Sequence, residues 1–126
     1  MEYRVTFYRT EAGDKPVVEF LESLRRTNEP LHKLVTAGIR KLKHRDNHGR
    51  PLTAPIGDTV GIMELRVGHA DIARVFFFFR SGREIVCTHG YVKKSMRPDP
   101  AEIERAKRYR ADWERRYPAA LERRER

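Results

Sequence analysis

Four consecutive phenylalanines, Phe76 to Phe79, lie within the segment 72–80. Side chains alternate between the two faces of a strand, so this run is apolar on both faces. A strand of this kind needs other elements to cover both of its sides. The sequence therefore predicts that residues 72–80 form a central strand with something packed on each face of its sheet.

Three further segments predict strands beside this one. Residues 61–67 alternate apolar with charged side chains, which is the pattern of a half-buried strand. Ser81-Gly82 is typical of a tight hairpin, so residues 84–91 are expected to return antiparallel to the central strand. Residues 3–7 alternate in the same way and predict a first strand near the start of the chain.

Residues 14–27, 28–48 and 99–117 have apolar side chains at helical spacing and a proline in the first turn. Side chains that cap the first backbone N–H groups precede each segment. The candidate N-caps are Asp14, Asn28 and Asp99. Residues 50–59 hold two prolines and one glycine, which predicts a loop.

The predicted order is strand, helix, helix, three antiparallel strands, helix. Because the first two helices need a sheet face to bury their apolar stripes, the prediction is an α+β fold with both helices on one face of an antiparallel sheet, a C-terminal helix, and the polar side of the sheet left available. The 126 residues are the usual size of one domain. We expect a single domain over residues 1–126, with about 119–126 as a frayed charged tail.

The chain is strongly basic, with 27 Lys+Arg against 18 Asp+Glu and a formal net charge of +9. A positive surface favours a polyanionic partner, and nucleic acid is the leading candidate because each neutralised phosphate releases counterions. Ribosomal RNA or an acidic protein satisfies the same charge argument. The candidate RNA contacts are Lys41, Lys43, Arg45 and Arg97. For the outer face of the second helix, a solvated charged surface is an equally good explanation.

Cys87 is the single cysteine and lies in an apolar run, which predicts a buried inert thiol and a reducing cytoplasm. The amino terminus lacks the pattern of a signal peptide, and no apolar run approaches the roughly 20 residues of a membrane helix. We expect a cytoplasmic protein with no membrane contact. The five histidines have no zinc-ligand spacing and the carboxylates do not cluster, so neither a metal nor another cofactor is predicted.

Glu64 and Arg66 share one face of the strand predicted over residues 61–67, and Arg74 can stand beside Arg66 if the next strand pairs closely. One interpretation is a set of cross-strand ion pairs, each worth roughly 0.2–1 kcal/mol. The other is that Arg66 and Arg74 hold a phosphate, because guanidinium offers a planar fork of donors that stays charged at physiological pH.

The last predicted strand ends in the heptapeptide 89–95, HGYVKKS, which gathers an imidazole, a phenol and two ammonium groups. Cleaving RNA without a metal needs a base for the ribose 2′-hydroxyl, cations for the phosphate and an acid for the leaving oxygen. His89 or Tyr91 could exchange protons, and Lys93 and Lys94 could bind phosphate. Gly90 would permit close approach of the backbone.

Each of these residues also has an ordinary structural explanation. His89 is expected to share a face with Ile85 and Cys87, which fits a core histidine with satisfied hydrogen bonds. Tyr91 fits a core or interface ring whose hydroxyl reaches water. A solvated loop accounts for the two lysines.

Taken together, three strings resemble a known family: the segment 61–66 (GIMELR), the segment 74–77 (RVFF) and the heptapeptide, followed by residues 98–106 (PDPAEIERA). They resemble the phage-derived, HigB-like branch of the RelE/ParE toxin superfamily. The resemblance covers nearly the whole chain. It implies a toxin of a type II toxin-antitoxin pair that cleaves messenger RNA in the ribosomal A site without a metal. Its implied partners are that messenger RNA, ribosomal RNA and a cognate antitoxin, often a helix-turn-helix DNA-binding protein.

By this resemblance, Arg66 and Arg74 match sheet arginines that face the scissile phosphate, and Tyr91 matches an aromatic residue that orients a base. Lys93 and Lys94 fall where related toxins have basic residues. Glu64 departs from the pattern, because RelE has a lysine there that serves proton transfer. Three alternatives remain open: Glu64 is the base, another group is the base, or Glu64 only orients Arg66. Two other functions fit the fold: inhibition of DNA gyrase in the manner of ParE, and RNA or ribosome binding without catalysis.

Overall fold

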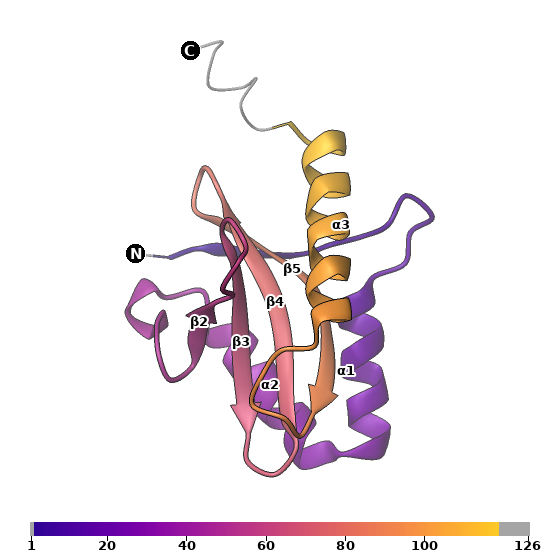
Figure 1. Ribbon diagram of the computed structural model, residues 1–126, viewed down its shortest axis with the longest axis vertical. Coiled ribbons are helices and arrows are strands. Elements are labelled where there is room, and N and C mark those ends of the chain that lie inside the picture. Colours follow the sequence, from indigo (N-terminus) through magenta and orange to yellow (C-terminus); the bar gives the residue numbers. More distant parts are fainter. Residues whose placement is uncertain (1, 119–126) are drawn as a thin grey trace.

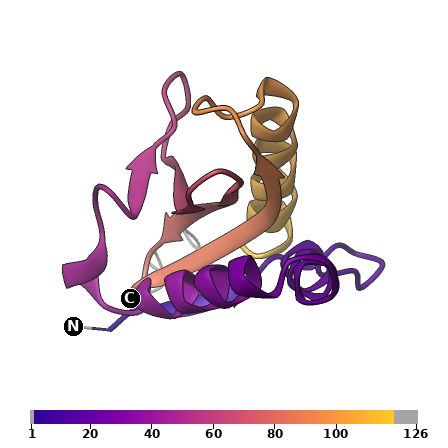
Figure 2. The same ribbon diagram turned by 90° about the horizontal axis from the view of Figure 1, so that it is seen from below.

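The computed structural model describes residues 2–118, so the tail expected over about 119–126 lies outside the described residues. Five strands form one sheet in the order β1-β5-β4-β3-β2. Helices α1 and α2 lie along one face of this sheet and α3 lies on the other (Figure 1, Figure 2). The elements in chain order are β1 (Arg4–Phe7), α1 (Pro16–Thr27), α2 (Glu29–Lys41), a 3-10 turn (Arg45–Asn47), β2 (Thr53–Pro55), β3 (Ile62–Gly68), β4 (Ile72–Arg80), β5 (Glu84–Lys93) and α3 (Pro100–Arg116).

The phenylalanine-rich strand β4 is the central strand, as predicted, and both of its faces are covered. Phe77 belongs to the large core beneath α1 and α2. Phe78 packs in a separate cluster with Trp113, and Phe76 in another with Ala106, both residues of α3. The two-sided apolar pattern thus places one helix pair and one single helix on opposite faces of the sheet.

The sequence predicted an antiparallel sheet, but the sheet is mixed. The pairs β2–β3, β3–β4 and β4–β5 are antiparallel, whereas β1 pairs with β5 in parallel. The strands from β2 to β5 reverse direction one after another, and their alternation leaves β5 running in the direction of β1. Strand β2 lies within the segment predicted as a loop. It has three residues, one of them Pro55 at the sheet edge, so it carries no alternation that a sequence pattern could reveal.

Two of the three predicted helix caps are present. Asn28 accepts a hydrogen bond from the backbone N–H of Leu31 at 3.2 Å, and Asp99 accepts one from Ala101 at 2.9 Å. The third prediction is wrong, because α1 begins after Lys15, and Asp14 instead donates its N–H to the hydroxyl of Thr10. Helix α2 ends at Lys41, earlier than expected, because the chain there turns into the 3-10 segment.

A β-bulge in β5 changes the face to which His89 belongs. Phe77 pairs with Cys87, whereas the preceding residue Phe76 pairs with His89, so Thr88 is the extra residue. His89 therefore points to the α3 face, opposite Cys87. The expectation that His89 shares a face with Cys87 is wrong, because strict alternation does not hold across the bulge. Cys87 itself is fully buried, and burial raises the pKa of its thiol to about 12.

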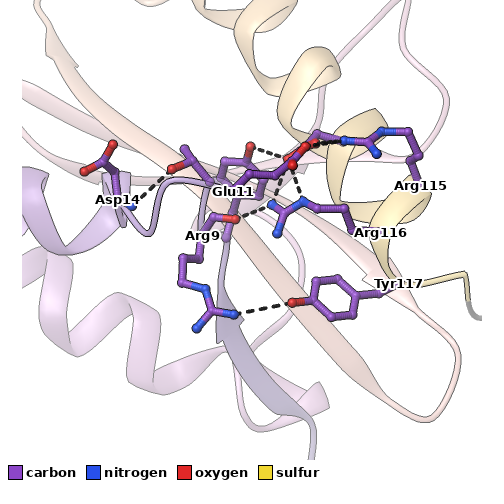
Figure 3. Close-up of polar contacts among 9 residues, drawn as sticks. Arg9, Glu11, Asp14, Arg115, Arg116 and Tyr117 are labelled. Atoms are coloured by element: carbon purple, nitrogen blue, oxygen red, sulfur yellow. Dashed lines mark hydrogen bonds and ion pairs between the residues drawn. The ribbon is translucent and has the colours of Figure 1, made fainter.

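The carboxy-terminal half of α3 is fixed by contacts with the chain that follows β1 (Figure 3). The hydroxyl of Tyr8 donates to Asp112 at 2.7 Å, and Arg116 donates to the same carboxylate oxygen at 2.7 Å. Arg115 donates to Glu11 at 2.7 Å. These contacts hold α3 over β4 and β5. The sequence predicted that this face of the sheet would be open, but α3 covers this part of it. The remaining part, over β3, carries the candidate site.

Candidate active site on strand β3

The charged residues predicted on the sheet lie on one face and next to one another. The register pairs Arg66 of β3 directly with Arg74 of β4, and Arg74 with Tyr91 of β5. Glu64 lies two residues before Arg66 and therefore on the same face. The alternation of the strands is what brings these side chains together.

Arg74 is completely buried and its terminal nitrogens are occupied. Nη1 donates to Oε1 of Glu64 at 2.5 Å, and Nη2 donates to the carbonyl oxygens of Ser95 at 2.8 Å and Met96 at 2.6 Å. In this arrangement Arg74 contacts the loop after β5 and has no surface for a phosphate. Its position holds Glu64 in place and fastens that loop over the sheet.

Glu64 is a buried carboxylate with a perturbed proton affinity. Its residue is 3% exposed, and burial raises its pKa above the ordinary value, while Arg74, Arg66 and Arg50 act in the opposite direction. Arg74 donates a hydrogen bond to Oε1, Arg66 forms an ion pair with the same oxygen, and Oε2 accepts no hydrogen bond from residues 2–118. A raised pKa lies closer to neutral pH, where a carboxyl group exchanges protons efficiently.

Arg66 is the accessible guanidinium of the predicted pair. Its side chain is 24% exposed, and its Nε lies 3.2 Å from Oε1 of Glu64. Arg66 and Glu64 both line a small hollow of about 150 Å³, which Pro98 borders from the loop before α3. Arg66 also lines a groove of about 770 Å³ that runs toward the turn between β3 and β4.

The groove has cationic and imidazole side chains along its walls. Lys41 comes from the end of α2, His48 and Arg50 from the segment before β2, and His69 from the turn after β3. Sequence reasoning named Lys41 but missed Arg50, which lies in the segment taken only as a loop. Arg50 carries no periodic signal, so only its placement beside Arg66 in space reveals it.

The family model described as Phage derived protein Gp49-like (DUF891) matches residues 19–111, from α1 into α3. The chain belongs to this Gp49-like family. The family is a RelE/HigB-like toxin family associated with toxin-antitoxin systems, and membership implies an antitoxin partner. The matched residues include the whole of β3, β4 and β5. No curated protein matches the chain.

Two further properties of the Gp49-like protein concern residues 2–118. No helix in this range combines the length and apolar character needed to cross a membrane. Nor do any three His, Cys, Asp or Glu side chains of this range lie close enough together to hold one metal ion.

His89 lies beneath α3 and away from the groove of the Gp49-like protein. Its ring nitrogens lie 3.1 Å from the hydroxyl of Thr88 and 3.1 Å from a carboxylate oxygen of Glu102. Burial lowers the pKa of His89 to about 4, although Glu102 acts in the opposite direction. His89 is thus a buried core residue, and a pKa this low favours its neutral form at physiological pH.

Tyr91, Lys93 and Lys94 line neither the hollow nor the groove. The hydroxyl of Tyr91 accepts the backbone N–H of Asp99 at 2.9 Å, and burial raises its pKa above the ordinary value. Lys93 is half-buried at the end of β5, and Lys94 is exposed in the loop that follows. The four predicted RNA contacts are exposed, but only Lys41 lines the groove. The others are Lys43, Arg45 and Arg97.

Gly90 permits a close approach, but of a helix and not of a substrate. A Cβ atom at this position would lie 2.4 Å from Cδ2 of Phe20, which belongs to α1. The absent side chain of Gly90 therefore lets α1 pack tightly on β5. The glycine of the heptapeptide serves the core of the Gp49-like protein.

Proposed function

We propose that this Gp49-like protein is the toxin of a type II toxin-antitoxin pair and cleaves messenger RNA in the ribosomal A site without a metal. The observation that carries the proposal is the placement of Glu64 beside Arg66, at the point where a small hollow meets a basic groove. A proton acceptor and a phosphate ligand are two of the three groups that metal-free RNA cleavage requires.

The proposed reaction is attack of a ribose 2′-oxygen on the adjacent phosphorus. Oε2 of Glu64 accepts the 2′-hydroxyl proton, and the guanidinium of Arg66 stabilises the negative charge that develops on the non-bridging oxygens. The bond to the 5′-oxygen breaks, and that oxygen takes a proton from Tyr91, Lys93 or Lys94. The products are a 2′,3′-cyclic phosphate and a 5′-hydroxyl end. Arg74 acts through Glu64 and is a positioning residue.

The exposed cations account for binding to the ribosome and to the message. Lys41 lies along the groove, and Lys43, Arg45 and Arg97 extend the positive surface on either side of it. Contacts of this kind go to the phosphate backbone and carry little sequence information. Codon preference would then come from the few bases that stack within the groove.

The test compares tightly controlled expression of the wild type with Arg66→Ala and Glu64→Gln. The wild type is expected to stop growth and to create new messenger 5′ ends within codons of translated messages. These ends should carry a hydroxyl and become ligatable only after phosphorylation. Both variants should abolish the new ends. The melting temperature of Arg66→Ala should stay near that of the wild type, whereas Glu64→Gln should melt lower because it leaves the buried Arg74 without its counter-ion. Arg74→Ala is less informative, because loss of its buried ion pair would destabilise the fold as well as the site.

Arg108→Ala provides the control, because Arg108 is an exposed cation on α3, away from the groove. This variant should cleave like the wild type. Growth arrest without new 5′ ends, together with loss of DNA supercoiling, would overturn the nuclease proposal in favour of a ParE-like activity. Saturated ribosomes with intact messages would reduce the protein to a binding module.

A further inference from the structure

We propose that Arg50 is the second guanidinium that grips the scissile phosphodiester, opposite Arg66. This inference rests on the proposed function and deepens it. Among residues 2–118, Arg50 and Arg66 are the two residues that line both the small hollow and the groove. A phosphate at the junction of the two spaces would therefore have one guanidinium on each side.

The backbone holds Arg50 beside Arg66. Within the segment 49–53, the N–H of Thr53 donates to the carbonyl of Gly49 at 3.0 Å, and the N–H of Gly49 donates to the hydroxyl of Thr53 at 2.6 Å. This closed turn has Arg50 near its tip. The turn is held to β3 at Arg66, because the backbone N–H of Arg66 donates to the carbonyl of Leu52 at 2.9 Å.

The donors of Arg50 are available to a ligand, in contrast to those of Arg74. Arg50 is exposed, and within the described part of the chain its side chain makes no hydrogen bond or ion pair. Nη1 and Nη2 of Arg74 are already taken by a carboxylate and two carbonyl oxygens. The sequence predicted the pair Arg66 and Arg74, whereas the pair that lines both the hollow and the groove is Arg66 and Arg50.

Arg50 lines the same hollow as Glu64 and also affects the charge of this carboxylate. Its positive charge lowers the pKa of Glu64, against the larger effect of burial. Two guanidinium groups can each present two parallel N–H donors to phosphate oxygens. Together they would neutralise the dianionic transition state of a phosphodiester in single-stranded RNA, while Glu64, which lines the same hollow, accepts the proton.

The first experiment measures single-turnover cleavage on ribosomes programmed with one message, at saturating protein. Removal of one donor group from a preorganised anion site lowers rates by about 10²–10³-fold, so Arg50→Ala should fall within or just below that range. Arg50→Lys should recover only part of the rate, because it restores the charge and not the fork. Arg108→Ala should stay within about twofold of the wild type, since exposed charges remote from a site contribute little.

The pH profile provides a readout that a purely structural role would not change. Without Arg50 the pKa of Glu64 rises, so the ascending limb of the cleavage rate should shift to higher pH in Arg50→Ala. Arg108→Ala should leave this limb in place. Equal rates and equal limbs for the two alanine variants would overturn the role of Arg50 while leaving the nuclease activity intact.

The second experiment does not depend on cleavage. Titration with inorganic phosphate is followed through the ¹⁵N–¹H resonances of the arginine Nε groups. Those of Arg50 and Arg66 should move along one common binding curve, and that of Arg108 should not. If the two resonances share one binding curve but the protein cuts no RNA, the anion site would be supported and the proposed nuclease function would be wrong. Movement of Arg66 alone, or of neither, would end the pairing proposed for Arg50.

Discussion

Arg74 shows how a single residue can serve a site without touching its ligand. A fully buried guanidinium is costly to desolvate, and Arg74 recovers that cost through Glu64 and two carbonyl oxygens. Replacement of one member of such a pair leaves the other as an uncompensated buried charge. Replacement of both members by apolar side chains removes the problem.

We therefore predict that Arg74→Met destabilises the protein by about 3–5 kcal/mol, and that the double variant Glu64→Leu/Arg74→Met loses much less. Urea denaturation would provide both values. Arg66→Met is the matched control, because its side chain is partly exposed and its ion pair should contribute about 1 kcal/mol or less. A double variant less stable than Arg74→Met would contradict this explanation.

His89 predicts a pH dependence of stability. Its pKa is about 4 in the folded protein against 6.5 for the free side chain, so the unfolded chain binds more protons between these values. Stability contributed by neutral His89 is present above about pH 6.5 and is lost as the pH falls toward 4. Between pH 7 and 4.5 the loss should reach about 2 kcal/mol.

The measurement compares the free energy of unfolding of the wild type with that of His89→Gln at both pH values. Glutamine cannot titrate, so the variant lacks this loss, and the difference between the two proteins should shrink on acidification. A constant difference would show that His89 does not titrate as described.

At the scale of elements, the contact between α1 and β5 depends on a missing side chain. Gly90 faces the ring of Phe20, and a methyl group there would overlap ring carbons. We predict that Gly90→Ala costs about 1–3 kcal/mol, the usual range for overpacking a core. Gly57→Ala is the control, because a Cβ atom there would meet nothing within 4 Å.

Thermal melting of the two variants would test this prediction. Gly90→Ala should also cost less in a Phe20→Ala background than in the wild type, because the ring that it would overlap is gone. Equal melting temperatures for Gly90→Ala and Gly57→Ala would show that α1 shifts freely on β5.

Periodicity revealed most of these elements before the structure was known. The apolar run of β4 predicted a strand covered on both faces, and Asn28 and Asp99 predicted two helix starts, because these signals are local. The sequence did not reveal the bulge at Thr88, because a single extra residue leaves the composition of the strand unchanged. It did not reveal the short edge strand β2 either, because three residues carry no alternation.

The site was harder to predict than the fold. Alternation placed Glu64, Arg66 and Arg74 on one face, but it contains no information about which loop covers that face. The segment after β5 buries Arg74, and the turn before β2 brings Arg50 beside Arg66. Both effects arise from irregular backbone, where sequence patterns are weakest.

At the scale of the whole molecule, the net charge of +9 is the property that governs association. Each phosphate contact with single-stranded RNA lowers the slope of log K against log salt by about 0.7. We predict that binding to programmed ribosomes weakens steeply with salt. Lys41→Ala should make this negative slope shallower by about 0.7, the value of one phosphate contact. Titrations at several salt concentrations would measure it, and a flat profile would contradict the electrostatic explanation.

The docking of α3 has a consequence for the timing of folding. Asp112 meets Tyr8 and Arg115 meets Glu11, so α3 is held by residues that come about 100 positions earlier in the chain. Because contacts between distant parts of a chain form only after the intervening loop has closed, the Phe76 and Phe78 side of the sheet stays uncovered until α3 docks.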